Sequence, residues 1–185
     1  MALKATIFKV QLSISDMDRN YYAEHDLTIA RHPSENNERM MLRILAFIFN
    51  ANESLAFTKG LSDVDVPDLW QKNLHDEIEH WIELGQPSAI RIKKGCNQAK
   101  QMTIYSYADG PFNQWWQKEA NQLRLKSNLT VTTIAPELAE ELANLVDRQM
   151  HLQCTLSEGQ LWLTITSQAD GEDPIEVTPQ TLSRN

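Results

Sequence analysis

The chain has 185 residues, of which 42% are hydrophobic and 23% are charged, and this composition is typical of a folded globular domain rather than of a disordered chain. The formal net charge of -8 argues against a strongly cationic nucleic-acid binder. No apolar run approaches the roughly 18 residues of a membrane span, so we expect a single domain, residues 1–185, in the cytoplasm.

The N-terminal part of the chain predicts a β-ribbon followed by a helix. Two segments with alternating apolar and polar side chains are expected to pair as a hairpin over residues 4–31. Ser34 is then the expected N-cap of a helix over residues 35–50. One apolar stripe along this helix supports the prediction and consists of Met41, Leu42, Leu45 and Ile48.

The middle and the end of the chain alternate between strands and helices. This order predicts an α/β core over about residues 34–148, with helices packed on one mixed sheet. A C-terminal hairpin is expected over residues 149–167, before a polar tail at 168–185. The predicted core elements are strands at 55–60, 68–72 and 78–85, a helix at 89–99, a strand at 102–108, a helix at 112–123, a strand at 129–135 and a helix at 137–149.

Charge reverses sharply near the middle of the chain. Residues 63–83 have a net charge of -6, whereas residues 86–100 contain four cations and no acid. Acids on a strand followed by cations on a helix are most simply two solvated surfaces. The alternative is a site that binds a metal ion and a phosphate group.

Alternation along the strand at 78–85 places Glu79, Trp81 and Glu83 on one face. Magnesium is held by one or two carboxylates together with water and phosphate oxygens, and Glu83 is the best candidate for such a ligand. Glu79 is a supporting candidate. Asp68 would lie close to Glu83 if its strand pairs with this one as a hairpin; the alternative is that Asp68 caps a turn after Pro67.

The following helix adds a candidate cation. At 100° per residue, Lys93 falls close to the apolar stripe formed by Ala89, Ile92 and Cys96, so we expect it to lean toward the sheet. It could contact a reacting phosphate there, or extend harmlessly to solvent. The same helical spacing predicts that Arg91 and Lys94 project from nearly the opposite side of the helix to the apolar stripe. Lys94 is therefore only a supporting candidate.

Two further features complete the candidate chemistry. Glu38 borders the core-facing stripe of the first helix, where it could serve a metal site or simply interact favourably with the helix dipole. The two cysteines, Cys96 and Cys154, form no CxxC pair and have no zinc-spaced histidines, so we expect buried free thiols and neither a disulfide nor a zinc site.

Five segments of the chain are informative together: ARHPSENNERMMLRILAF, TKGLS, DLWQK, WIELGQPSAIRIKKGC and FNQWW. They resemble the YaeQ family, and the resemblance extends over nearly the whole chain. It implies a variant of the PD-(D/E)XK nuclease fold, which has a restriction-endonuclease-like core. In that fold a helix glutamate, a strand aspartate and a strand glutamate hold a divalent metal, and a lysine assists cleavage of the phosphodiester bond.

The resemblance assigns roles to individual residues. Asp68 after Pro67 matches the PD element, Glu83 matches the acidic position of (D/E)XK, and Glu38 matches the helix acid, so these three would bind Mg²⁺ or Mn²⁺. Gly85 stands where the lysine is expected. Related nucleases sometimes supply that lysine from the following helix, where Lys93 lies.

The resemblance therefore implies a metal-dependent nuclease that acts on nucleic acid. The alternative is a non-catalytic descendant that binds nucleic acid or the transcription machinery, because the family is also associated with transcript elongation. No residue of the sequence can be assigned to that association.

Overall fold

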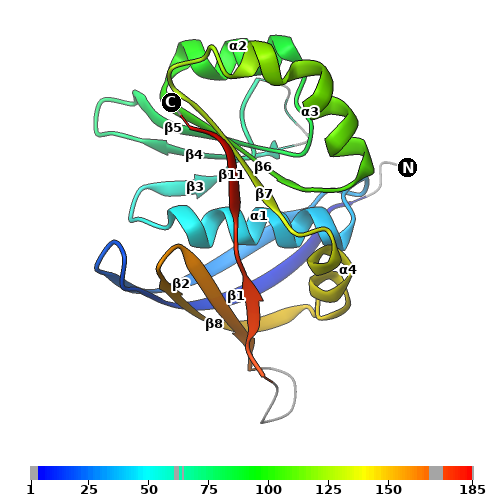
Figure 1. Cartoon of the computed structure of the whole chain (residues 1–185). Coiled ribbons are helices and arrows are strands. Elements are labelled where there is room, and N and C mark those ends of the chain that lie inside the picture. Colours follow the sequence, from blue (N-terminus) through cyan, green and yellow to red (C-terminus); the bar gives the residue numbers. More distant parts are fainter. Residues whose placement is uncertain (1–3, 61–62, 64, 167–172, 185) are drawn as a thin grey trace. The chain divides into compact units, whose positions relative to one another are not determined.

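The computed structural model describes residues 4–60, 63, 65–166 and 173–184, and the chain divides into two compact units (Figure 1). The first unit consists of Met1–Met41 and Glu137–Pro179, and the second of Leu42–Pro136 and Gln180–Asn185. Helix α1 (Asn37–Asn50) begins in the first unit and ends in the second. No helix in the described ranges is long and apolar enough to cross a membrane.

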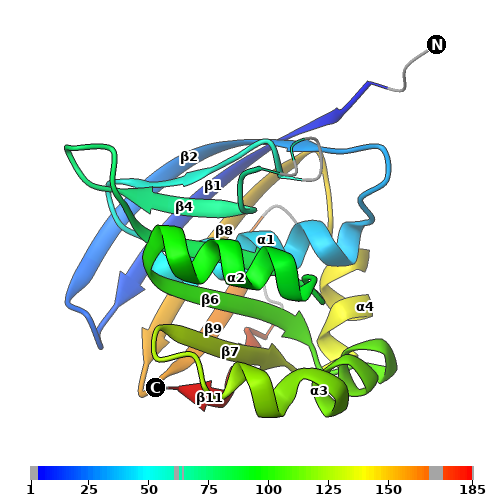
Figure 2. The same ribbon diagram turned by 90° about the horizontal axis from the view of Figure 1, so that it is seen from above.

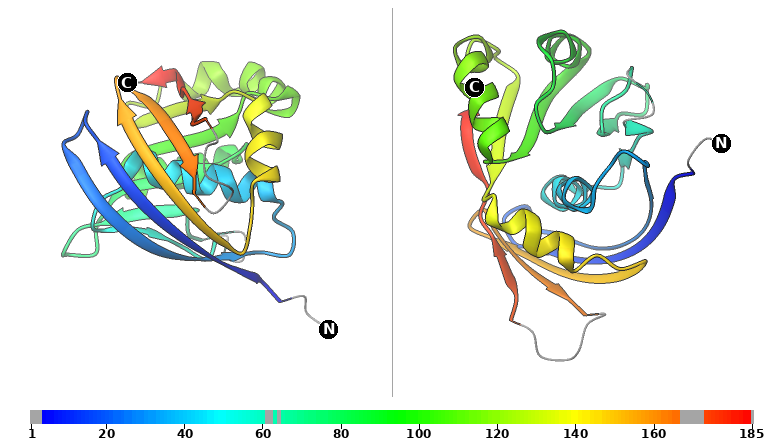
Figure 3. Two further views of the ribbon diagram at one scale, coloured as in Figure 1. Left: turned by 90° about the horizontal axis from the view of Figure 1, so that it is seen from below. Right: turned by 90° about the vertical axis from the view of Figure 1, so that its right-hand side faces the viewer.

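The first unit is built on a five-stranded sheet with the order β10-β9-β8-β1-β2, whose long strands are visible in Figure 3. The predicted N-terminal ribbon is confirmed, because β1 and β2 pair antiparallel, and so is the C-terminal hairpin of β8 and β9. Strand β8 also pairs parallel with β1. The elements are β1 (Thr6–Asp16), β2 (Tyr21–Arg31), α4 (Glu137–Asn144), β8 (Gln149–Ser157), β9 (Gln160–Ile165) and β10 (Ile175–Val177).

The second unit contains a six-stranded sheet with the order β11-β7-β6-β5-β4-β3. Its parallel strands β5, β6 and β7 are connected through α2 and α3, which lie on the same face of the sheet (Figure 2) and share one apolar core with it. The elements are β3 (Leu55–Phe57), β4 (Leu69–Lys72), β5 (Ile78–Leu84), α2 (Ala89–Gln98), β6 (Ala99–Tyr107), α3 (Gly110–Leu123), β7 (Leu129–Ile134) and β11 (Gln180–Arg184).

The mixed α/β class with terminal hairpins is confirmed, but three details of the prediction are wrong. The strands form two sheets instead of one. The expected polar tail contributes β10 and β11, although its residues 168–172 lie outside the described part of the chain. The first helix is capped by Asn36 rather than Ser34, because the Asn36 Oδ1 atom accepts a hydrogen bond from the Arg39 N–H group at 2.9 Å.

Candidate functional site

Asp68 and Glu83 are brought together by the pairing of β4 with β5. The two strands pair as an antiparallel hairpin, which meets the condition that the sequence analysis set for this contact. Leu69 lies opposite Ile82, and the Asp68 N–H group donates to the Ile82 carbonyl at 3.0 Å. The Asp68 Oδ2 atom accepts a hydrogen bond of 3.0 Å from the N–H group of Leu84, the residue after Glu83. Both acids are only 2% exposed, so the unit contains two buried carboxyl groups on neighbouring strands.

Glu83 is held from two sides. Its Oε1 atom accepts a hydrogen bond of 2.7 Å from Trp81 Nε1, and its Oε2 atom accepts one of 2.9 Å from Arg91 Nε. Burial raises the pKa of Glu83 above its ordinary value, Arg91 opposes the rise, and the negative charge of Asp68 adds to it. The contribution of Asp68 to this pKa is smaller than those of burial and Arg91.

The cation that the second helix contributes to Glu83 is Arg91, and the predicted orientation of Lys93 is wrong. Lys93 is exposed and makes no polar side-chain contact within the described ranges. Arg91 bonds Glu83 and also donates from Nη2 to the Val66 carbonyl at 2.6 Å. Lys94 reaches the same segment, since its Nζ atom lies 2.5 Å from Asp65 Oδ1.

The phase of α2 explains this correction. The buried residues of the helix are Ile92 and Gly95, whereas Ala89, which the predicted stripe included, is exposed. A Cβ atom on Gly95 would lie 2.6 Å from Met102 Sδ and 3.1 Å from Trp81 Cδ1, so the helix approaches the sheet along the Gly95 side. Because successive residues turn by about 100°, this approach places position 91 beside the sheet and position 93 on the outer side.

Gly85 has a structural reason to replace the expected lysine. Its φ of 80° lies in the left-handed region that favours glycine, and its N–H group donates to the Tyr105 carbonyl at 2.8 Å. The chain leaves β5 at this residue and enters α2 after the Ser88 N-cap, whose Oγ atom accepts from the Arg91 N–H group. The position that would carry a strand lysine is thus used for the turn that delivers Arg91.

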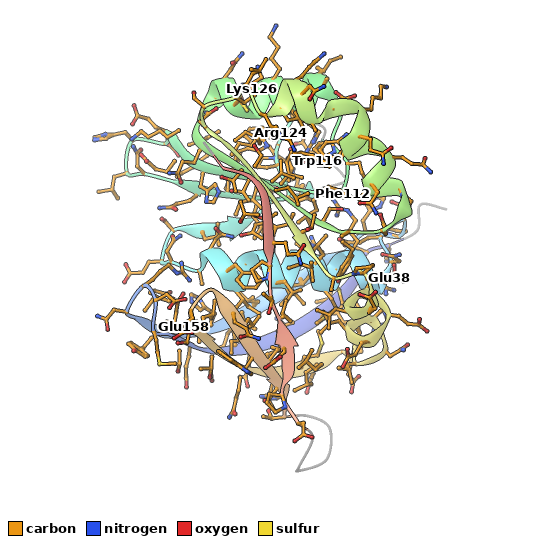
Figure 4. All side chains as sticks on the ribbon, in the orientation of Figure 1. Glu38, Phe112, Trp116, Arg124, Lys126 and Glu158 are labelled. Atoms are coloured by element: carbon orange, nitrogen blue, oxygen red, sulfur yellow. The ribbon has the colours of Figure 1, made fainter. Side chains whose placement is uncertain are left out.

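The supporting acids lie apart from this pair in their contacts. Glu79 lies near the start of β5, and its Oε1 atom accepts hydrogen bonds from Lys100 Nζ at 2.6 Å and Asn73 Nδ2 at 3.0 Å. The bond from Lys100 lowers the pKa of Glu79. Glu38 (labelled in Figure 4) is exposed in the first turn of α1, in the part of this helix that belongs to the first unit, and its role as a metal ligand stays a prediction.

Sequence reasoning missed Arg91 and Trp81 as the partners of Glu83. The hydrogen bond from Trp81 to Glu83 could have been predicted from strand alternation, because residues two apart share a face. A buried indole N–H group also needs an acceptor. Predicting the contact between Arg91 and Glu83 would have required the observed phase of α2. That phase depends on Gly95, which lets the helix pack closely on the sheet, and a pattern of apolar residues does not reveal it.

The acid pair has the chemistry of a small cation site. Among the described residues no three His, Cys, Asp or Glu side chains gather as a metal cluster. Magnesium, however, is commonly held by one or two protein carboxylates, with water and substrate phosphate as the remaining ligands. The Arg91 guanidinium already forms an ion pair with Glu83. Asp68 and Glu83 carry the kind of oxygen ligand that magnesium and manganese bind, and their role as metal ligands stays a prediction.

The raised pKa of Glu83 predicts how stability depends on pH. A carboxyl group with a raised pKa favours the folded protein when protonated; this contribution is complete below the unfolded value near 4.5 and is lost as the pH rises through the folded value. We expect the free energy of unfolding of the wild type, relative to Glu83→Gln, to fall as the pH rises from about 4.5 toward neutrality. Urea unfolding across this range measures the difference, and a constant difference would contradict the assignment.

The chain is similar to known proteins in both sequence and structure. A family model described as YaeQ protein matches residues 1–171. The YaeQ proteins of Salmonella typhi and Escherichia coli (strain K12) are 44% and 43% identical to the chain over 164 residues, which cover 89% of this chain and 91% of each relative. The crystal structure of YaeQ from Xanthomonas axonopodis pv. citri matches with a TM-score of 0.90 and 36% identity, covering 98% of this chain and 99% of that one. YaeQ from Pseudomonas syringae also matches with a TM-score of 0.90, at 35% identity, covering 98% of this chain and 97% of that one.

Proposed function

This chain belongs to the YaeQ family, and we propose that it acts as a divalent-metal-dependent nuclease whose site is built on Asp68 and Glu83. One observation supports this proposal above all others. Two buried carboxyl groups are brought together by the pairing of β4 with β5, and an arginine from the next helix forms an ion pair with one of them.

Each residue of the site has a role that follows from its contacts. Asp68 is fixed by the N–H group of Leu84, and Glu83 is oriented by Trp81, so both carboxylates are held before a cation binds. A bound Mg²⁺ or Mn²⁺ would supply an activated water and polarise the scissile phosphate. Arg91 would exchange its bond with Glu83 for phosphate oxygens, which its planar guanidinium can bind in pairs.

In this proposal Arg91 takes the role that the sequence suggested for Lys93. Arginine stays protonated at all working pH values, so it would stabilise the charge that develops on the phosphoryl group rather than transfer a proton. Lys94 contributes indirectly, because its contact with Asp65 helps to fix the segment whose Val66 carbonyl binds Arg91.

A second candidate function is favoured by the contacts of Glu83. Both of its oxygens already accept hydrogen bonds, from Trp81 and from Arg91, so the buried pair would be complete without any metal. The protein would then be a non-catalytic relative of the nucleases that binds nucleic acid or a transcription protein. The response to metal separates the two candidates.

We expect millimolar Mg²⁺ or Mn²⁺ to raise the melting temperature of the wild type, because a ligand that binds only the folded state stabilises it by about 2.7 kcal/mol at 100 times its Kd. For a chain of this size that corresponds to roughly 5–10 °C. Asp68→Asn and Glu83→Gln should abolish the rise, because each removes one of the carboxylates that would bind the metal. Differential scanning calorimetry with and without metal makes the measurement.

Asp76→Asn is a matched control for these two variants. Asp76 is an exposed acid in the turn between β4 and β5, and its φ of 63° suits asparagine. An equal rise in the wild type and in all three variants would mean that the metal binds elsewhere. No rise in the wild type would favour the non-catalytic candidate.

A further inference from the structure

The part of the chain that surrounds the site is positively charged although the protein is acidic. Residues 89–128 contain seven lysines and arginines but only two acids, Asp109 and Glu119. The formal net charge of the whole chain is nevertheless -8. The remaining residues are therefore strongly acidic, and the segment from α2 to the end of α3 stands out as a concentrated positive region.

The seven cations divide into paired and exposed ones. Arg91, Lys94 and Lys100 pair with Glu83, Asp65 and Glu79, whereas Lys93 and Lys118 are exposed on α2 and α3.

Helices α2 and α3 pack on the same core of the second unit through Ile92, Phe112 and Leu123, so their outer sides face away from the same side of the sheet. The Asp109 side chain is used as the N-cap of α3, and the side chain of Glu119 is only 17% exposed. The exposed residues of the two helices include Lys93 and Lys118 and several amides, and none of them is acidic.

The end of α3 adds a positioned arginine. The guanidinium of Arg124 lies 5.5 Å from the centroid of the Trp116 ring, which in turn stacks on Phe112 in the core (Figure 4). Arg124 is itself exposed. Lys118, six residues before Arg124, has an 82% exposed side chain, and its Nζ atom lies 3.9 Å from Glu119 Oε1. Exposed cations are thus distributed along α3 as well as on α2.

We propose that these outer sides of α2 and α3 form a docking surface for the phosphate backbone of a nucleic acid, which we call the basic helical face, with Lys93, Lys118 and Arg124 as its principal cations. Lysine and arginine supply most of the affinity for a phosphate backbone, and amide side chains supply hydrogen bonds to phosphate and sugar without reading sequence. The basic helical face therefore fits sequence-independent binding.

This inference rests on the proposed function, because it names how the substrate of the Asp68–Glu83 site is held. Helix α2 contributes to both places: Arg91 contacts Glu83, while Lys93 lies on the outer side. A membrane surface is a weaker candidate as partner. A helix that binds membranes presents an apolar stripe, whereas α3 exposes mainly amides between its cations.

Fluorescence anisotropy with a labelled 30-nucleotide single strand and a 30-base-pair duplex tests the proposal, in EDTA and between 50 and 200 mM salt. The test variant is Lys93→Glu/Lys118→Glu. The control is Lys4→Glu/Lys9→Glu, which replaces two exposed lysines of the first unit and lowers the net charge equally. Melting curves establish that both variants fold.

We expect the test variant to bind at least tenfold more weakly than the wild type at 50 mM salt, with a slope of log K against log salt that is smaller by about 2. The control should lose much less affinity. Equal losses in both variants, no binding by the wild type, or stronger binding to phosphatidylserine vesicles than to nucleic acid would overturn the proposal. The two proposals can fail separately: binding by the wild type that weakens in the test variant, without any metal-dependent cleavage by the wild type, would refute the nuclease and leave the basic helical face.

Discussion

Arg91→Met is expected to lower the free energy of unfolding by about 3–5 kcal/mol at pH 7, because it leaves the buried charge of Glu83 without its cation. The side chain of Glu83 is 3% exposed and that of Arg91 is 23% exposed, so water cannot replace the lost contact. The substitution also removes the hydrogen bond from Arg91 to the Val66 carbonyl. Urea unfolding followed by tryptophan fluorescence measures the change.

The double variant Arg91→Met/Glu83→Gln is the control for this result. It should recover a large part of the lost stability, since a neutral amide is far less costly to bury than an unpaired carboxylate. Lower pH should also reduce the effect of Arg91→Met, because Glu83 then becomes protonated. A loss below about 1 kcal/mol, the size typical of exposed ion pairs, would contradict the buried character of this pair.

The residues of the acid pair could be predicted from the sequence because their placement depends on short-range rules. Strand alternation put Trp81 and Glu83 on one face, and a hairpin of β4 and β5 was sufficient to bring Asp68 beside them. The turn at Gly85 and the N-cap at Ser88 also follow from local chemistry. The family resemblance added the metal hypothesis but not the geometry.

The phase of α2 and the division into two sheets could not be predicted from such short-range rules. The helix turns toward Met102 and Trp81 on its Gly95 side, and a glycine gives no signal in an apolar pattern. The first sheet depends on β1 pairing in parallel with β8, more than 130 residues later, and local periodicity does not specify such a partner. For the same reason β10 and β11 were predicted as tail.

The observed phase of α2 places its three cations in different surroundings. Arg91 faces the acid pair, Lys94 holds Asp65, and Lys93 is left on the basic helical face. Lys93 is thus expected to influence substrate affinity and its dependence on salt, rather than the chemical step. This expectation differs from a catalytic role in a way that single-turnover kinetics can resolve.

Metal-dependent cleavage by the wild type, Asp68→Asn and Glu83→Gln tests the nuclease proposal most directly. With single-stranded and duplex DNA and RNA at saturating concentration, we expect cleavage by the wild type only when Mg²⁺ or Mn²⁺ is present. Each variant should lower the single-turnover rate by ~10²–10³, the loss typical when one preorganised electrostatic group is removed. Asp76→Asn should cleave at the wild-type rate. Equal rates in the wild type and in the two acid variants, or no cleavage by the wild type with either metal, would contradict the assignment of Asp68 and Glu83 as a nuclease site.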